Sequence, residues 1–241
     1  MPRIRNMRLY DRMLWATIIV VPLVGLYLVM KSVGLAREAA RQAQCSCNLC
    51  MVAVAFLNYH ETYGRFPPAY TVDSFGRPMH SWRTLILPFA LSGTPFPYNF
   101  DEPWDSPGNL AVIPSIPNFY QCPSDPTIHT NPGMTNYVVV QGKPTAFPGS
   151  HSVRIDDLGA RMAETLMVVE VKKMAIPWTA PVDLNFETMS FRVNDGSGNG
   201  ISSHHPGVAN VSHFDGRHSA LHNTITPEQL RARLTIPTNS R

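Results

Sequence analysis

The sequence predicts an α+β fold in which one long N-terminal helix packs on a small antiparallel, β-rich head. Residues 13–30 contain no charged side chain and are mostly Leu, Ile, Val and Met. The helical pattern continues to Gly64, and Pro67 and Pro68 prevent it from going further. Beyond these prolines, short β-prone segments alternate with turns rich in Pro and Gly, which is typical of a β-rich domain with irregular loops.

Composition sets the size of the fold and excludes one class of partner. The chain has 241 residues, 44% of them apolar, which is enough for one good-sized core. Its 22 Pro, 15 Gly and 15% charged residues favour turns and short strands over a mostly helical enzyme. The formal charge is only +3, and the basic residues do not gather into one patch, so we expect no nucleic-acid partner.

Residues 13–31 are predicted to form a transmembrane helix. Eighteen helical residues rise about 27 Å, close to the roughly 30 Å hydrocarbon core of a bilayer. A cleaved signal peptide is the alternative, but no small-x-small cleavage site follows the apolar segment. The basic residues number four before the segment and three in the first fifteen positions after it, which favours a cytoplasmic N-terminus.

These features divide the chain into four parts. Residues 1–12 are the cytoplasmic basic tail, 13–31 the membrane span, 32–64 its soluble helical continuation, and 65–241 the extracytoplasmic head. Within the head, strands are expected at 69–72, 119–122, 136–140, 166–171 and within 209–222, with a short helix near 82–87. Thr226 and Gln229 form a capping box around Pro227, which predicts a helix to about Leu234.

Asp215 and Gly216 are predicted to form a two-residue type I′ turn between the last two strands. In that register His213 lies opposite His218, and both imidazoles share one face of the hairpin. Joined by the loop before the hairpin, they make a candidate zinc site. Its ligands would be His204, His205, His213 and His218. The alternative, which we favour, is that the hairpin histidines only pack on a half-buried sheet.

A series of segments in order carries a family resemblance. They are residues 36–41, Cys45, Asn48 and Leu49, residues 58–68, 79–83, 102–105, 122–125, 135–137 and 168–171. The closing signature is His205, followed after nine residues by Asp215 and Gly216. The chain thereby resembles a large bacterial family of pilin-like proteins of unknown function with a prepilin-type H-x9-D-G domain. The resemblance implies the architecture of type IV pilins and type II secretion pseudopilins, anchored in the inner membrane.

The N-terminal region departs from that family. Its members carry a Gly-Phe-Thr-Leu-x-Glu processing site, whereas residues 9–14 here are Leu-Tyr-Asp-Arg-Met-Leu. Lys31 also stands where the family has a helix-bending proline. We therefore expect an uncleaved, membrane-anchored protein.

The resemblance also implies a disulfide between Cys45 and Cys122, the two cysteines that match the family. Disulfides are the ordinary fate of paired thiols outside the cytoplasm. The bridge would close a loop of about 78 residues, worth about 4 to 5 kcal/mol by loop entropy. Cys47 and Cys50 are left as helix-packing residues or free thiols. A three-cysteine metal site on the helix is disfavoured, because Cys45 and Cys47 point about 200° apart.

No recognised catalytic motif is present, so the leading expectation is a non-enzymatic structural component of a cell-envelope or secretion-related assembly. Its expected partners are the membrane and other pilin-like or envelope proteins, contacted through the N-terminal helix. Two alternatives remain: a solute- or glycan-binding module using Trp82, Trp104 or Trp178, and a metal-dependent hydrolase built on the four histidines. No cofactor is required, although calcium at Asn194, Asp195 and Asn199 is left open beside zinc.

Overall fold

The structure is a computed structural model that describes residues 9–91 and 95–237, with side chains described from residue 13 onward. It divides into two compact units, Met1–Ala40 and Arg41–Arg241. The predicted α+β class with a long N-terminal helix is confirmed. The predicted basic tail at residues 1–12 lies outside the described residues, apart from the backbone of residues 9–12. Those four residues already belong to the long helix, which therefore begins before the predicted position 13.

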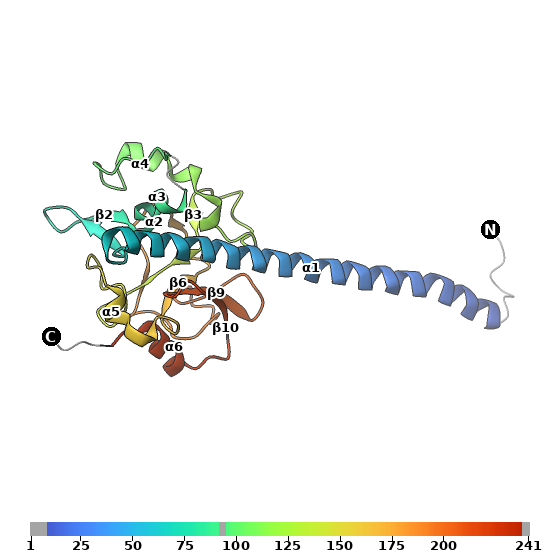
Figure 1. The fold of residues 1–241 in the computed structure, drawn as a ribbon. Coiled ribbons are helices and arrows are strands. Elements are labelled where there is room, and N and C mark those ends of the chain that lie inside the picture. The colour runs from blue at the N-terminus through green and yellow to red at the C-terminus, as the bar shows by residue number, and fades with distance from the viewer. Residues whose placement is uncertain (1–8, 92–94, 238–241) are drawn as a thin grey trace. The chain divides into compact units, whose positions relative to one another are not determined.

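Helix α1 (Leu9–Tyr63) has 55 residues, with Pro22 inside it. Figure 1 shows α1 as one continuous helix. By length and composition, it contains a segment able to cross a membrane, and nothing in the structure buries that segment. The helix ends as predicted: Gly64 takes a φ of 68°, which few residues other than glycine adopt, and its N–H donates to the carbonyl oxygen of His60 at 2.7 Å.

The globular unit uses the C-terminal part of α1 as a core element. The buried positions of this part follow helical spacing: Cys45, Asn48, Leu49, Val52, Ala53, Ala55 and Phe56. Because residues three and four apart share one face of a helix, these side chains form a continuous stripe. The Phe56 ring lies 5.2 Å from the Trp82 ring and 6.0 Å from the Phe147 ring, centroid to centroid.

A small β-hairpin and short helices follow α1. Strands β1 (Tyr70–Val72) and β2 (Pro78–Ser81) pair antiparallel. Ser81 then caps α2 (Trp82–Leu85), which α3 (Leu87–Ala90) continues, close to the helix predicted near 82–87. Helix α4 (Pro107–Ala111) and the single 3-10 turns η2 (Ile113–Ser115) and η3 (Asn118–Tyr120) lead into the sheet region.

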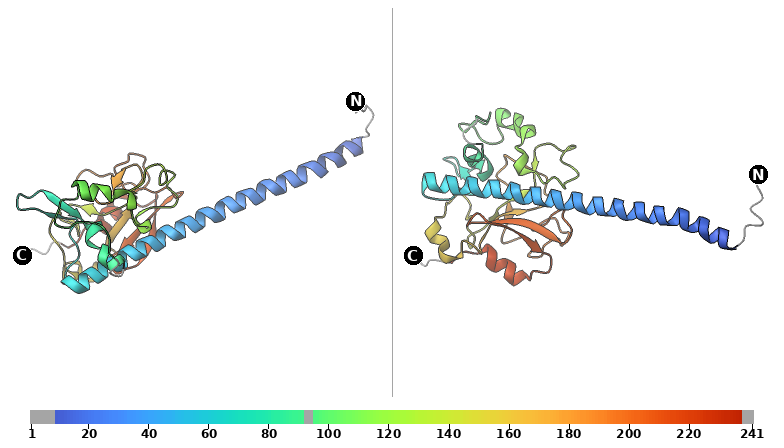
Figure 2. Two further views of the ribbon diagram at one scale, coloured as in Figure 1. Left: turned by 90° about the horizontal axis from the view of Figure 1, so that it is seen from above. Right: turned by 45° about the vertical axis from the view of Figure 1, so that its right-hand side comes forward.

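The main sheet has four antiparallel strands in the order β10-β9-β6-β4. They are β4 (Tyr137–Val138), β6 (Leu166–Glu170), β9 (Val208–His213) and β10 (His218–His222). Figure 2 shows the last strands of this sheet, coloured orange to red, beside the C-terminal part of α1, where Cys50 Sγ lies 3.3 Å from His218 Nδ1. Two short pairs flank the sheet. Strand β3 (Met134–Thr135) pairs antiparallel with β7 (Ile176–Pro177), and β5 (Val140–Gln141) pairs parallel with β8 (Leu184–Asn185).

Two apolar clusters form the core of the globular unit. The first joins the buried stripe of α1 to aromatic rings such as Phe66, Trp82, Tyr120 and Trp178. The second joins strands β6, β9 and β10 to α6 (Pro227–Leu234), through Leu230 and Leu234. Helix α6 begins with the predicted capping box of Thr226 and Gln229. A short helix α5 (Ile155–Leu158) and the turn η4 (Gly159–Arg161) precede β6.

The predicted strand at 119–122 is wrong. Residues 118–120 form the 3-10 turn η3, with the Tyr120 N–H donating to the carbonyl oxygen of Pro117 at 2.9 Å. Proline lacks an N–H and restricts the residue before it, so Pro117 and Pro123 leave little room for a paired strand. The segment predicted at 136–140 is also broken, because β4 and β5 pair with different partners.

The predicted type I′ turn is wrong as well. Asp215 keeps a negative φ, and only Gly216 is left-handed, with φ 86°. The His213 N–H donates to the Arg217 carbonyl at 2.8 Å, so residues 214–216 form a three-residue loop. The register therefore shifts by one, and His218 pairs with Ser212. Because consecutive strand residues point to opposite faces, His213 and His218 lie on opposite faces of the hairpin.

Candidate functional site

The chemically richest place in the described chain is a buried group of four side chains, here called the buried cluster: Cys45, Cys122, Glu170 and His205. One donor atom from each lies within 4.8 Å of the others. Their exposed fractions are 0%, 2%, 1% and 2%. They come from α1, from the turn after η3, from the end of β6 and from the loop before β9.

The distances within the buried cluster are short. The Sγ atoms of Cys45 and Cys122 are 2.8 Å apart, and both cysteines are free thiols. The Cys122 Sγ lies 3.5 Å from Nε2 of His205. The same Nε2 lies 3.8 Å from Oε1 of Glu170. The two cysteines that the resemblance pairs therefore lie together, but the structure shows no bond between them.

The turn that carries Cys122 is held by Asn136 and Asp125. The Asn136 side-chain oxygen accepts from the Cys122 N–H at 2.8 Å, and its Nδ2 donates to Asp125 at 2.7 Å. The Asp125 N–H in turn donates to the Cys122 carbonyl at 2.9 Å. Burial alone would raise the pKa of Asp125, but hydrogen bonds from Asn136 and Thr127 outweigh it and lower that pKa.

Glu170 and His205 are fixed by the sheet and by the loop before β9. Both oxygens of Glu170 accept from Asn210, one from its N–H at 2.7 Å and the other from Nδ2 at 3.3 Å. The His205 N–H donates to Ser203 Oγ at 3.2 Å, and the Ser203 N–H donates to Asn194 at 2.8 Å. These contacts fix the Glu170 carboxylate on β9 and the backbone of the loop that carries His205.

Tyr137 completes the surroundings of the buried cluster. In the register of β4 and β6 it stands opposite Glu170. Burial, followed by the charge of Glu170, raises the pKa of Tyr137. A hydrogen bond with Cys45, followed by burial, raises the pKa of Cys122. Among the described residues, the Tyr137 hydroxyl has no hydrogen-bond partner.

The four histidines proposed as zinc ligands are not brought together. His204 lies 3.7 Å from Asp125, His213 Nε2 lies 2.8 Å from Ser219 Oγ, and His218 Nδ1 lies 3.3 Å from Cys50 Sγ. Among the residues that the structure describes, only His205 of this set joins a group of metal-ligating side chains. The predicted site fails because it required His213 and His218 to share a face, which the three-residue loop prevents.

The other candidate residues are dispersed. Trp82 and Trp178 are fully buried core residues, whose indole N–H groups donate to Asp183 and to the Ile113 carbonyl, and Trp104 is half-buried. These two core rings are therefore no surface platform for a glycan. Cys47 is exposed, and Cys50 contacts His218.

In the loop proposed for calcium, the candidate ligands form hydrogen bonds with other residues of the protein. Asp195 accepts from Ser190 and Ser197, and the Ser190 hydrogen bond is the main cause of its lowered pKa. The Asn194 Nδ2 donates to the Val208 carbonyl, and Asn199 Nδ2 donates to the Thr188 carbonyl.

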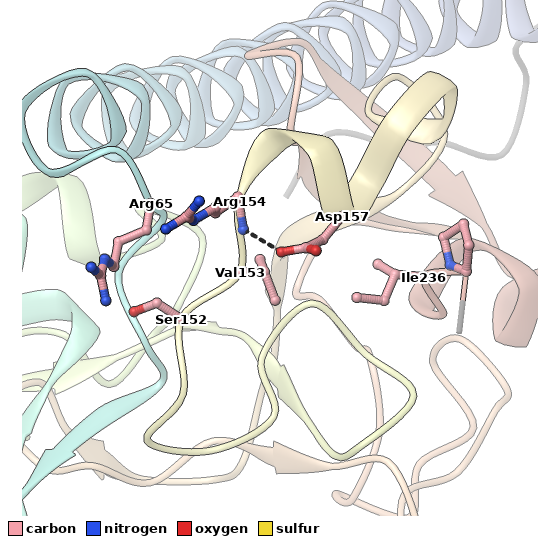
Figure 3. Close-up of a pocket in the computed structure, with 7 residues that line it drawn as sticks. Arg65, Ser152, Val153, Arg154, Asp157 and Ile236 are labelled. Carbon is pink, nitrogen blue, oxygen red and sulfur yellow. Dashed lines mark hydrogen bonds between the residues drawn. The ribbon is translucent and has the colours of Figure 1, made fainter. Parts of the chain in front are cut away.

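A surface cavity of about 490 Å³ lies beside α5 (Figure 3). Arg65, Arg154 and Asp157 line it, and the dashed line in Figure 3 marks the Arg154 N–H donating to Asp157 at 2.8 Å. That bond caps the first turn of α5. No member of the buried cluster lines this cavity.

Sequence reasoning missed Glu170 and Tyr137 as site residues. Both lie in segments that carry the family resemblance, 168–171 and 135–137. Neither segment contains a recognisable spacing of metal ligands. The donors of the buried cluster come from parts of the chain that are far apart in sequence. The resemblance was the only signal that could have singled them out.

Comparisons with known proteins identify a family and no individual relative. Residues 35–169, more than half of the chain, match a family described as a protein of unknown function, DUF1559. Neither the curated proteins nor the solved structures gave a match. The matched range includes Cys45, Cys122 and Tyr137 and ends one residue before Glu170. The chain therefore belongs to the DUF1559 family.

Proposed function

We propose that this protein is a non-enzymatic, membrane-anchored, pilin-like structural component of a cell-envelope or secretion-related assembly. In this proposal the span lies in the inner membrane, the N-terminal tail is cytoplasmic, and the head lies outside the cytoplasm. The protein acts by packing its helix against other helices in the membrane and by presenting the head to envelope partners.

The observation that carries the proposal is the change in surface along α1. In the stretch from residue 13 to 30, large apolar side chains are exposed on every side, for example Val21 at 66%, Leu23 at 59% and Val24 at 49%. Water is a poor solvent for such a surface, whereas lipid or a neighbouring apolar helix covers it well. From Cys45 onward the same helix is part of the core of the head. A membrane anchor whose helix continues into the core of a folded head is the architecture of a pilin.

The buried cluster supports a non-enzymatic role. Its four side chains are at most 2% exposed, so they present no surface to a substrate. Binding sites for small molecules are concave and open enough to admit the ligand. We therefore assign the buried cluster to the architecture of the head rather than to catalysis.

Site-specific photo-crosslinking in the native membrane tests the proposal. A crosslinking residue replaces Leu26 or Val33, which are 55% and 43% exposed. We expect adducts with the N-terminal helices of other pilin-like proteins, identified by peptide mass. The matched control replaces Met51, 42% exposed on the part of α1 that belongs to the head, and should not give those adducts. Adducts with lipid alone at both membrane positions would contradict the proposal.

Intact-mass analysis of the detergent-extracted protein tests the expected lack of processing. Leu9 and Leu14 stand where pilins carry the processing glycine and the glutamate. We therefore expect residues 1–12 to remain attached. A new N-terminus near Tyr10 would overturn this part of the proposal and would restore ordinary pilin maturation.

A further inference from the structure

The buried cluster has the composition of a closed metal site. Two thiols, one imidazole and one carboxylate are the ligand types that zinc takes in proteins, and structural zinc sites use four of them. The four donors come from segments far apart in the chain, so one ion would join α1 to the turn after η3, to β6 and to the loop before β9. We propose that Cys45, Cys122, Glu170 and His205 bind one zinc ion that fastens the helix to the head.

The spacing of the donors is close to what tetrahedral coordination requires. Ligands about 2.0 to 2.3 Å from zinc lie about 3.3 to 3.8 Å from one another. The Cys122 to His205 distance of 3.5 Å and the His205 to Glu170 distance of 3.8 Å fall in that range. The two sulfurs, at 2.8 Å, are closer and would separate by about 1 Å on coordination.

The charge of Glu170 provides an independent reason for a cation. Its side chain is 1% exposed, and buried carboxylates are ordinarily paired with a positive group or coordinate a metal. Within residues 9–91 and 95–237, no lysine or arginine forms an ion pair with it. Its contacts are the neutral Asn210 and the imidazole of His205. A divalent ion would place a positive charge beside this carboxylate.

The Tyr137 hydroxyl is a second observation that points to a ligand. This oxygen is buried and makes no hydrogen bond of ordinary geometry with the described residues. It lies beside Cys45, Cys122 and Glu170. Atoms that coordinate zinc are commonly held by hydrogen bonds from a surrounding layer of residues. The phenol would donate to a ligand of the zinc-bound cluster.

A disulfide between Cys45 and Cys122 is the competing state of the same two sulfurs. It would consume two of the four donors. Zinc binding uses all four, which is why we choose it. The two states exclude each other, so one preparation can decide between them.

The test begins with the full-length protein, extracted into detergent without a chelator. A control sample is extracted in parallel with a thiol-blocking reagent. We expect one zinc ion per chain by elemental analysis. Cobalt exchanged into the site should show thiolate charge-transfer bands and the intense visible bands of a tetrahedral ion. Removal of the ion by a chelator should lower the melting temperature, because a ligand that binds only the folded state stabilises it. These readouts need no variant.

Variants then assign the ligands. Cys122→Ser and His205→Gln should lose the stoichiometric zinc, and Glu170→Gln should weaken zinc binding by about tenfold or more. The matched controls are Cys47→Ser and His204→Gln, which change the same residue types next to the buried cluster and should keep the ion. A Cys45–Cys122 linked peptide with no zinc would overturn the proposal. Free thiols with no zinc and no cobalt spectrum would overturn it equally.

Discussion

The two ends of helix α1 show how the same secondary structure serves two environments. Between residues 13 and 30 the apolar side chains surround the helix, and the structure buries none of them. Between residues 45 and 56 the buried side chains follow one face, and Met51 and Val54 on the other face are exposed. An apolar surface all round the helix needs lipid or other helices, whereas a single apolar stripe needs one protein core. The pattern of burial, rather than the amount of apolar sequence, distinguishes the expected membrane anchor from the part of α1 that belongs to the core of the head.

The largest effect is expected from the stripe in the core. Phe56→Ala removes a fully buried ring that contacts Trp82 and Phe147, and should lower the free energy of unfolding of the head by about 3 to 5 kcal/mol. Val54→Ala is the matched control on the same helix: this side chain is 52% exposed, and the loss should stay within about 0.5 kcal/mol. Urea unfolding followed by tryptophan fluorescence measures both. Equal losses would show that the stripe is not a core element.

A charged residue in the apolar half of α1 tests whether that half spans a membrane. Val20→Arg places a cation near the middle of the expected span, which costs about 2.5 to 3.5 kcal/mol for insertion. We expect less protein in the membrane fraction. Met51→Arg, a charge on an exposed position of the head's part of α1, should leave that fraction unchanged. Alkaline extraction of membranes followed by immunoblotting measures the distribution. An unchanged distribution for Val20→Arg would argue against a membrane span.

The long helix, its C-terminal end and the start of α6 could be predicted because their signals are local. A run of eighteen uncharged residues, Gly64 before two prolines, and the Thr226 capping box each act within a few positions of the chain. The hairpin register was missed because it depends on a single dihedral angle. Asp215 and Gly216 fit a two-residue or a three-residue loop, and only the sign of φ at Asp215 separates them.

The buried cluster could be predicted only in part. The resemblance paired Cys45 with Cys122 and marked His205, because all three lie in recurring segments. The spatial meeting of Glu170 with His205 depends on how β6, β9 and the intervening loop are arranged, with the Ser202 N–H donating to the Glu170 carbonyl at 3.0 Å. Contacts of this kind come from tertiary structure, and no spacing within one segment encodes them.

The loop of the hairpin next to the helix offers a smaller test of the head. Gly216 has φ 86°, and a Cβ there would lie 3.2 Å from Leu57 of α1. Gly216→Ala should therefore cost about 1 to 2 kcal/mol, mostly from the left-handed backbone. The control, Arg217→Ala, removes an exposed ion pair with Asp215 that contributes about 1 kcal/mol at most. Thermal unfolding of the detergent-solubilised protein compares the two. A neutral Gly216→Ala would show that the loop takes another conformation.

The smallest effect concerns His213 and pH. Burial is the main cause of its lowered pKa, because the charged imidazole loses its hydration in the head. The folded state therefore binds this proton less readily than the unfolded state, whose histidine pKa is about 6.5. The stability that the neutral imidazole contributes is present above that value and is lost as pH falls through it toward the lower folded pKa. His213→Phe removes the titrating group and also a buried Nδ1 that has no hydrogen-bond partner in the described chain.

We expect His213→Phe to lose less stability than the parent between about pH 7 and pH 5, and to be at least as stable at the lower pH. The control is His222→Phe, an exposed position on β10 of the same hairpin. Melting temperatures across that pH range measure the slope. Because His213 and His218 lie on opposite faces of the hairpin, adding His218→Val should change stability by an independent amount. A strong coupling between the two substitutions would restore the two-residue turn and place the imidazoles together.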